Sequence, residues 1–344
     1  FLADFETAVA RHLGVKHAVG VSSCTTGLML TYKCLGLTGE VVVPSFTFMA
    51  TVSALVWAGL RPVFADVDPG ATNLDPQAAE AAITSRTSAI VAVHNFGNPA
   101  EIDALWDIAQ RHHLRLIFDA AHGFGALYHG QPVGAQADAQ VYSLSPTKLL
   151  IAGEGGIVAT NHDDLAAALR MGREYGNDGN YDSAFPGMNA RLGEYNALLG
   201  LRSLDMLEEA AVTRNETALL YQEALGGLPG LGFQQVAAGN RCSYKDFSLT
   251  VDAGAFGLTR DELALALAAE NVDNRKYYEP PVHRQSAYCE FYAGQPLPGT
   301  NWLAANSLSL PIWARMDPRV SLGICEAIQR AYEHQAAIRK HLQQ

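Results

Sequence analysis

The chain is poor in charged residues, which make up 17% of its 344 positions, and basic residues are the scarcer kind. It has 24 lysines and arginines against 35 aspartates and glutamates, which gives a net charge of −11. Proteins that bind nucleic acids usually carry a surplus of basic residues, so this balance argues against such a partner. No apolar run has the length of a membrane-spanning helix, and the first residues do not follow the pattern of a signal peptide. We therefore expect neither a nucleic acid nor a membrane as partner.

Cysteines are also few, and the five present are scattered without a CxxC pair. This spacing disfavours a disulfide framework and a zinc site, and we expect no metal. It fits a reduced protein of the cytoplasm. Hydrophobic residues, at 49%, suffice for a large core, and the length of the chain suggests two domains.

Short apolar segments alternate with helical patterns of about ten residues through the first half of the chain. This alternation predicts a mainly parallel, doubly wound α/β sheet. A long helical pattern at 192–225 and mixed segments beyond it favour a smaller α+β part. We expect a large α/β domain at 1–210 and a small α+β domain at 211–344. The expected strands are 17–21, 40–44, 61–66, 89–93, 114–118, 140–144, 156–160 and 244–251; further helices are expected at 1–13, from 22–27 to about 35, and at 49–58, 75–83, 101–112, 163–173, 260–270 and 320–342.

Polar and aromatic residues follow several of the predicted strands of the α/β part. Phe48, His94, Asp119 and Lys148 all fall at or just after strand ends. Because open α/β sheets bind ligands at the carboxyl ends of their strands, we expect these residues to surround one site.

Lys148 lies between small hydroxyl residues and a glycine-rich turn, directly after an apolar strand. Desolvation in such a place lowers the pKa of a lysine, which makes its amine nucleophilic and able to form a Schiff base. A surface lysine near a turn is the other interpretation. Thr25 and Thr26 open a helix, where hydroxyls either cap the helix or help its free N–H groups to bind a phosphate.

Pyridoxal phosphate needs this set of groups together. A lysine holds its aldehyde, an aspartate keeps its ring nitrogen protonated, a helix start binds its phosphate, and an aromatic ring packs on its face. Lys148, Asp119, the Thr25–Thr26 helix start and Phe48 occur in an order that fits these roles.

The sequence resembles the DegT/StrS family of pyridoxal-phosphate sugar aminotransferases of fold type I, over nearly its whole length. The motifs that carry the resemblance are SCTTGL at 23–28, VPSFTF at 43–48, FADVD at 64–68, VHNFG at 93–97, DAAH at 119–122, SLSPTK at 143–148, GEGG at 153–156, GMNAR at 187–191 and YEPPVH at 278–283.

The resemblance implies a fold-type-I transferase with Lys148 and Asp119 as catalytic residues. It also implies that Asn189 reaches the cofactor of a second subunit, so that a homodimer with shared active sites is needed. The cofactor-binding residues implied in this way are Thr25, Thr26, Phe48, Asp119, His122, Ser143, Lys148 and Asn189. The substrate-binding candidates are His94, Arg191, Tyr278 and His283, and for His94 a structural cap at the strand end is the other interpretation.

Two positions depart from the usual pattern of the family. Cys24 replaces a glycine beside Thr25, and His122 stands where many members have glutamine. His122 either bonds the phenolic oxygen of the cofactor, in which case its protonation matters, or orients Asp119. Lys148 is intact, whereas relatives that carry histidine there are dehydratases.

The expected reaction passes an amino group, from L-glutamate by family resemblance, to a nucleotide-linked keto-deoxysugar at C3 or C4. Pyridoxal phosphate would carry the group as pyridoxamine phosphate in the second half-reaction. Basic and aromatic residues at 275–284 suit a diphosphate and a base, although a solvated loop fits them as well. The alternatives are a cyclitol aminotransferase, a pyridoxal-phosphate-dependent sugar dehydratase and a non-catalytic cofactor-binding sensor.

Overall fold

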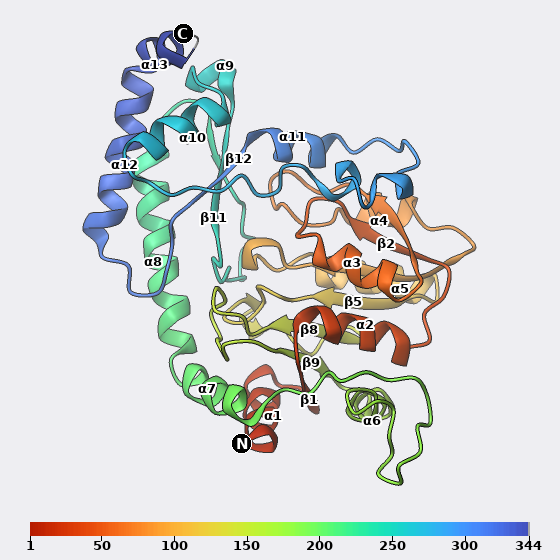
Figure 1. The fold of residues 1–344 in the computed structure, drawn as a ribbon. Helices are drawn as coiled ribbons and strands as arrows, with labels where there is room; N and C mark the ends of the chain where they lie inside the picture. The colour runs from red at the N-terminus through yellow and green to blue at the C-terminus, as the bar shows by residue number, and fades with distance from the viewer. Residues whose placement is uncertain (343–344) are drawn as a thin grey trace.

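A computed structural model describes residues 1–342 and shows a seven-stranded sheet between two layers of helices (Figure 1). The strands lie in the order β1-β9-β8-β5-β4-β2-β3, and only β9 runs antiparallel to its neighbours. The prediction of a mainly parallel, doubly wound sheet is therefore confirmed. The strands are β1 (His17–Val21), β2 (Glu40–Pro44), β3 (Arg61–Ala65), β4 (Thr87–Val93), β5 (Arg115–Asp119), β8 (Ala139–Ser143) and β9 (Gly156–Thr160).

Alternate strand residues build two separate cores, one on each face of the sheet. Val41 and Val43 pack toward α2, α3 and α6, whereas Val42 packs toward α1, α4, α5 and α7. This is the period of two that a strand imposes on its side chains. The helices are α1 (Leu2–Leu13), α2 (Cys24–Cys34), α3 (Ala50–Trp57), α4 (Pro76–Ala81), α5 (Ile102–Arg111), α6 (Asp163–Gly172) and α7 (Glu194–Leu204).

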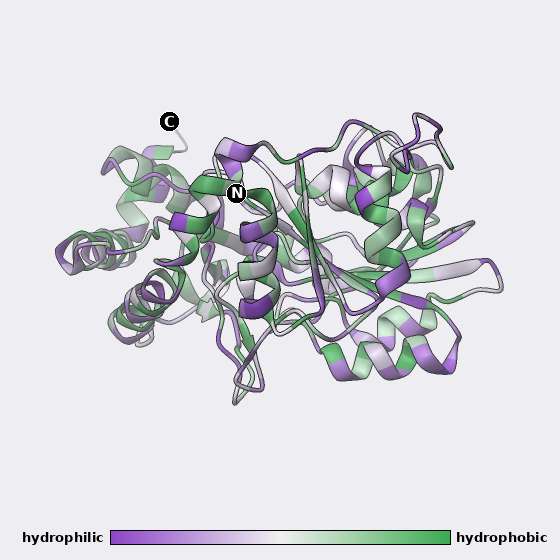
Figure 2. Ribbon diagram, turned by 90° about the horizontal axis from the view of Figure 1, so that it is seen from below, coloured by the Kyte–Doolittle hydropathy of each residue, from purple (hydrophilic) through white to green (hydrophobic). Residues whose placement is uncertain are grey.

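The second part of the chain forms a three-stranded antiparallel sheet covered by helices. Its core contains buried residues between Ala218 and Ala331. Figure 2 shows that the helices around both sheets alternate hydrophobic and hydrophilic residues, as expected of helices that bury one face. Its elements are α8 (Leu207–Leu225), β10 (Leu231–Phe233), β11 (Phe247–Val251), α9 (Ala253–Phe256), α10 (Arg260–Ala269), α11 (Pro298–Asn306), β12 (Ser307–Leu310), α12 (Pro318–Glu333) and α13 (Gln335–Leu342).

Two helical patterns that suggested single long helices are each divided. The pattern at 192–225 forms α7 and α8, separated by Asp205 and Met206. α7 packs on α1 and α8 packs on α12, and one straight helix could not contact both partners. The pattern at 320–342 likewise forms α12 and α13, separated by His334.

The segment after α10 returns to the large sheet. Val282 and Leu297 are buried in the core beside α2 and α3, and Tyr278 packs against the rings of Phe46 and Phe96. The division at 210/211 stays a prediction, because these contacts join the C-terminal part of the chain to the α/β part.

Candidate active site

A cavity of about 320 Å³ opens at the carboxyl ends of the central strands, and we call it the lysine cavity. It lies where β4, β5 and β8 end and α2 begins, since parallel strands bring their carboxyl ends to the same edge of a sheet. The predicted site residues that line it are Thr25, Phe48, Asp119, His122, Ser143, Lys148 and Tyr278.

Asp119 is the last residue of β5, and its carboxylate accepts from the Cys24 thiol at 3.8 Å and from two closer donors. The hydroxyl of Thr51 on α3 donates to Oδ2 at 2.7 Å, and the backbone N–H of Ala121 donates to Oδ1 at 3.0 Å. The side chain is buried, and burial raises the pKa of this carboxyl above its usual value. A nearby positive group would therefore stabilise the ionised carboxylate.

Lys148 lies on the loop between β8 and β9, and its backbone N–H donates to the Ser145 carbonyl oxygen. Burial lowers the pKa of its amine, and the charge of Lys245 lowers it further. Among residues 1–342, no carboxylate forms an ion pair with this amine. The amine is therefore poised to react as a nucleophile.

His122 follows β5 and supplies a neutral ring to the cavity. Burial, followed by the charge of Lys148, holds its pKa well below the usual value. Its Nδ1 is buried and has no hydrogen-bond partner among the described residues. Because buried polar atoms are normally satisfied, this nitrogen indicates a polar group of a bound molecule.

The start of α2 is capped by its own side chains. Ser23 Oγ accepts from the backbone N–H of Thr26, and Thr26 Oγ1 accepts from that of Ser23. The Thr26 hydroxyl is thus used in the cap, whereas Thr25 lines the cavity. Phe48 is 53% exposed and leaves a ring face free at the cavity, as a stacking partner requires.

Besides Thr26, four predicted residues lie outside the lysine cavity of this chain. The ring of His94 is buried, stacks on Phe118, accepts from the Ala100 N–H and bonds Gln140 Oε1, and burial lowers its pKa to about 4. Both ring nitrogens of His94 are therefore used within the fold.

The other three are held by contacts elsewhere. Nδ1 of His283 bonds Ser45 Oγ at 2.7 Å. Arg191 is partly exposed and pairs with Glu174, beside which Asn189 is also exposed. The substrate and cofactor roles expected of these residues stay predictions.

Several residues of the lysine cavity were not among the predicted site residues, although Glu154 lies in the GEGG motif and Tyr277 in the segment 275–284. Glu154, Lys245, Asp246 and Tyr277 line it, and Thr51 holds Asp119 from behind. The adjacent opposite charges at 245 and 246, just before an apolar strand, were the available hint. The basic residues at 275 and 276 do not line it; they pair with Asp273 and Asp261.

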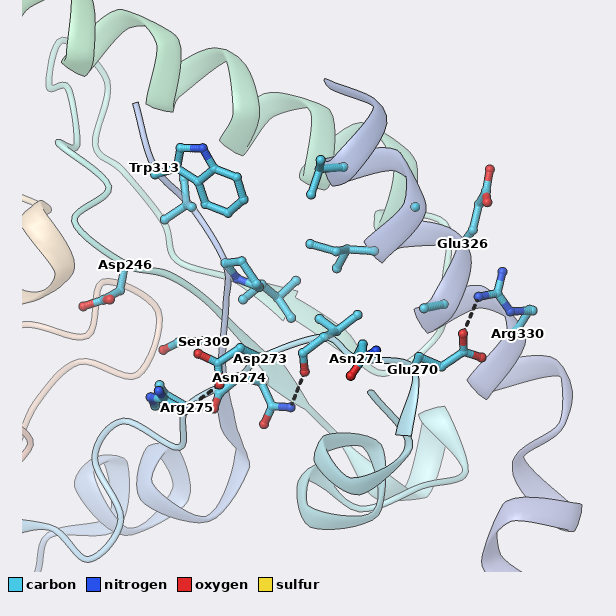
Figure 3. Close-up of a pocket in the computed structure, with 18 residues that line it drawn as sticks. Asp246, Glu270, Asn271, Asp273, Asn274, Arg275, Ser309, Trp313, Glu326 and Arg330 are labelled. Carbon is cyan, nitrogen blue, oxygen red and sulfur yellow. Dashed lines mark hydrogen bonds and ion pairs between the residues drawn. The ribbon is translucent and has the colours of Figure 1, made fainter. Parts of the chain in front are cut away.

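A larger cavity of about 750 Å³ lies beside α12, and we call it the α12 cavity (Figure 3). Its two arginines are paired with acids, Arg275 with Asp273 and Arg330 with Glu270. Among residues 1–342, no lysine lines it, and only Asp246 borders both cavities. The chemistry of the residues, and not the volume, therefore identifies the lysine cavity as the candidate active site.

The lysine cavity fits pyridoxal phosphate. It offers a desolvated amine, a buried carboxylate that lacks a cationic partner, an unpartnered histidine nitrogen and a helix start with a free hydroxyl. Among residues 1–342, no three His, Cys, Asp or Glu side chains are arranged to hold a metal ion, and none of the helices is long and apolar enough to cross a membrane.

A doubly wound sheet with this lysine and aspartate at adjacent strand ends has the architecture of an α/β aminotransferase. Residues 1–329 match the model of the DegT/DnrJ/EryC1/StrS aminotransferase family, and the chain belongs to that family. Aminotransferases of this family depend on pyridoxal phosphate. The family prediction is therefore confirmed.

Similar proteins of known sequence or structure agree with this assignment. GDP-perosamine synthase of Caulobacter vibrioides is 34% identical over 91% of this chain and 85% of its own. The dTDP-3-amino-3,4,6-trideoxy-alpha-D-glucose transaminase of Streptomyces venezuelae is 35% identical, over 95% and 86%. The crystal structure of DesI in the presence of its TDP-sugar product is 40% identical, covers 98% of this chain and 87% of that chain, and has a TM-score of 0.90.

Proposed function

We propose that the protein transfers an amino group from L-glutamate to a nucleotide-linked keto-deoxysugar, with pyridoxal phosphate bound in the lysine cavity. The observation that carries this proposal is the convergence of Lys148 and Asp119 in that cavity. The names of the similar proteins, a perosamine synthase and an amino-sugar transaminase, support a sugar nucleotide as acceptor.

The residues of the cavity have separate roles in the proposed reaction. Bound pyridoxal phosphate supplies an electron sink for the charge that remains when the α-hydrogen of the donor leaves. Lys148 would hold the cofactor through its amine, and the same amine is placed to move a proton at the donor α-carbon as general base and acid. The Asp119 carboxylate would keep the ring nitrogen of the cofactor protonated. His122, held neutral, donates or accepts without adding charge.

The remaining groups position the cofactor. The N–H groups at the start of α2 and the hydroxyls of Thr25 and Ser143 would bind the phosphate, because a helix N-terminus favours an anion. Phe48 would stack on the ring of the cofactor. All five cysteines are free thiols, which supports a reduced, cytoplasmic location.

Incubation with L-glutamate and candidate ketones tests this function. We expect 2-oxoglutarate to form in step with an amino sugar when a dTDP- or GDP-linked keto-deoxysugar is present. Reaction with a keto-cyclitol but with neither nucleotide sugar would replace the proposal with the cyclitol alternative. Loss of a sugar hydroxyl without 2-oxoglutarate would identify a dehydratase.

We further propose a homodimer in which each subunit completes the site of the other. α7 exposes Tyr195 and Leu199, with exposures of 87% and 55%, and exposed apolar residues in one region are typical of an interface. Asn189 lies outside the cavity of its own chain and is free to reach a partner.

Sedimentation measures this association directly. The wild-type protein should sediment as a dimer at micromolar concentration, and Leu199→Asp should shift it toward monomers because a charge would be buried in the interface. Leu265→Asp places the same charge at an equally exposed position on α10, at 56%, and should leave the dimer intact. A monomeric wild-type protein would contradict the proposal.

A further inference from the structure

A short segment of the C-terminal part, residues 242–246, crosses to the strand ends of the large sheet. The backbone N–H of Ser243 donates to the Gly97 carbonyl oxygen, and that of Lys245 donates to the Phe96 carbonyl oxygen. The Ser243 hydroxyl also donates to the His122 carbonyl oxygen at 2.7 Å. These bonds fix the segment to the loops that follow β4 and β5.

Two further residues keep this segment in place. Arg214 on α8 is buried, and its Nη1 donates to the carbonyl oxygens of Tyr244 and Lys245 at 2.7 and 3.0 Å. Gly97 has a φ of +95°, and a Cβ built on it would lie 1.9 Å from Ser243 Oγ. Only glycine allows the two loops to approach so closely.

The segment places the Lys245 side chain at the wall of the lysine cavity. Only 12% of this side chain is exposed, and Nζ lies 2.9 and 3.1 Å from the two carboxylate oxygens of Asp246. An ammonium group has three N–H donors, and among the described residues its hydrogen bonds go to Asp246 alone. At least one donor is therefore available to a bound molecule.

The Asp246 carboxylate is turned away from the other labelled acids of the α12 cavity (Figure 3).

We propose that Lys245 binds the α-carboxylate of the amino donor and so determines which molecules can donate an amino group. This inference rests on the proposed function, since it assigns a second cation of the same cavity to one of the two substrates. None of the cofactor roles assigned above falls to Lys245.

The position of Lys245 favours a carboxylate that lies next to the reacting amine. Lys245 and Lys148 line one cavity of about 320 Å³, and the charge of Lys245 lowers the pKa of Lys148. In an α-amino acid, the carboxylate is bonded directly to the carbon that bears the amine. In a sugar nucleotide, the ring separates the diphosphate from a keto group at C3 or C4.

The charges that line the cavity also favour a carboxylate over a diphosphate as the ligand of Lys245. Its lining holds three carboxylates, those of Asp119, Glu154 and Asp246, against the two lysines. One carboxylate is tolerated beside a shared ammonium group, whereas a diphosphate would bring two or more negative charges against Asp246 and Glu154. Lys245 is therefore matched to a singly charged group.

The test separates the two half-reactions on the cofactor-loaded enzyme. The half-reaction with L-glutamate alone is monitored by the loss of the visible absorption of the cofactor. It gives the glutamate concentration at which the rate is half-maximal. The keto sugar nucleotide is then added to enzyme already aminated by glutamate. This second half-reaction gives the acceptor concentration at which the rate is half-maximal. Calorimetric titration with maleate, a dicarboxylate without an amine, measures carboxylate binding independently of turnover.

We expect Lys245→Met to raise the half-maximal glutamate concentration and the Kd of maleate by about 30-fold, because a charge-assisted contact in an enclosed site is lost. The half-maximal concentration of the keto sugar nucleotide should change less than about threefold. Lys16→Met is the matched control; Lys16 is 62% exposed and pairs with Asp163 outside the cavity, and all three values should stay at wild type.

Because Lys245→Met leaves Asp246 unpaired in an enclosed site, the double variant Lys245→Met/Asp246→Asn accompanies it and removes both charges. Lys245→Arg keeps the charge and should shift the glutamate and maleate values only. A weaker acceptor half-reaction with unchanged glutamate and maleate values would overturn the proposal in favour of a diphosphate site. Unchanged values in all variants would reduce Lys245 to a structural partner of Asp246. A wild-type enzyme that binds maleate but transfers no amino group would contradict the proposed function and not the carboxylate site.

Discussion

Lys148→Ala is expected to lower the rate of amino transfer by about 10⁴-fold or more, because the lysine serves both as covalent anchor and as proton carrier. The fold should survive this change. The side chain ends in a cavity, pairs with no carboxylate among residues 1–342, and lies near the like charge of Lys245. Truncation therefore removes a desolvated amine without leaving a buried partner. The amino transfer rate and the midpoint of thermal unfolding measure the two effects.

Chemical labelling ties the loss of activity to this residue. Borohydride should fix pyridoxal phosphate onto the peptide that contains Lys148 in the wild-type protein and onto no peptide in Lys148→Ala. Lys16→Ala removes an exposed lysine and should keep both label and rate. Label on another lysine, or a variant that retains a hundredth of the activity, would refute the assignment. Unchanged partner binding together with no activity in either protein would favour the non-catalytic sensor.

The sequence predicts the part of the site that local patterns control. Asp119 and Lys148 follow apolar strands, and the ends of parallel strands converge whatever the remainder of the chain does. A strand end does not determine which way the next side chain points. His94 illustrates this limit, because Gln140 and Phe118 on neighbouring strands hold its ring inside the sheet.

The contacts that a single sequence could not reveal join residues distant in the chain. The expected strand at 244–251 begins at Phe247, because residues 243–245 bond the loop at 96–97 and the side chain of Arg214 instead of a neighbouring strand. No local period encodes that docking, so Lys245 was missed. Thr51 was missed for a similar reason, since its bond to Asp119 spans 68 positions.

Asp119→Asn is expected to stabilise the cofactor-free protein at pH 7 while weakening cofactor binding at least about 30-fold. The second effect follows from the loss of a buried charge that would pair with the protonated ring nitrogen. The first follows from desolvation, because burial raises the pKa of Asp119 in the folded protein. A carboxyl with a raised folded pKa contributes stability below its unfolded pKa and loses it as the pH rises through the folded pKa. At pH 7 the ionised group therefore costs stability, and asparagine avoids this cost.

Asparagine fits the same space and hydrogen bonds. Its oxygen can accept from the Ala121 N–H, and its amide can donate to Thr51 Oγ1, since a hydroxyl both donates and accepts. Urea unfolding of the cofactor-free proteins should show the gain for Asp119→Asn at pH 7 and none near pH 3, where the carboxyl is protonated in both states. Asp138→Asn is the matched control. This buried aspartate accepts from the Leu116 N–H and pairs with Arg115, so its replacement should lower stability and leave cofactor affinity unchanged. A less stable Asp119→Asn protein at pH 7 would mean that Asp119 contributes to the fold more than to the cofactor.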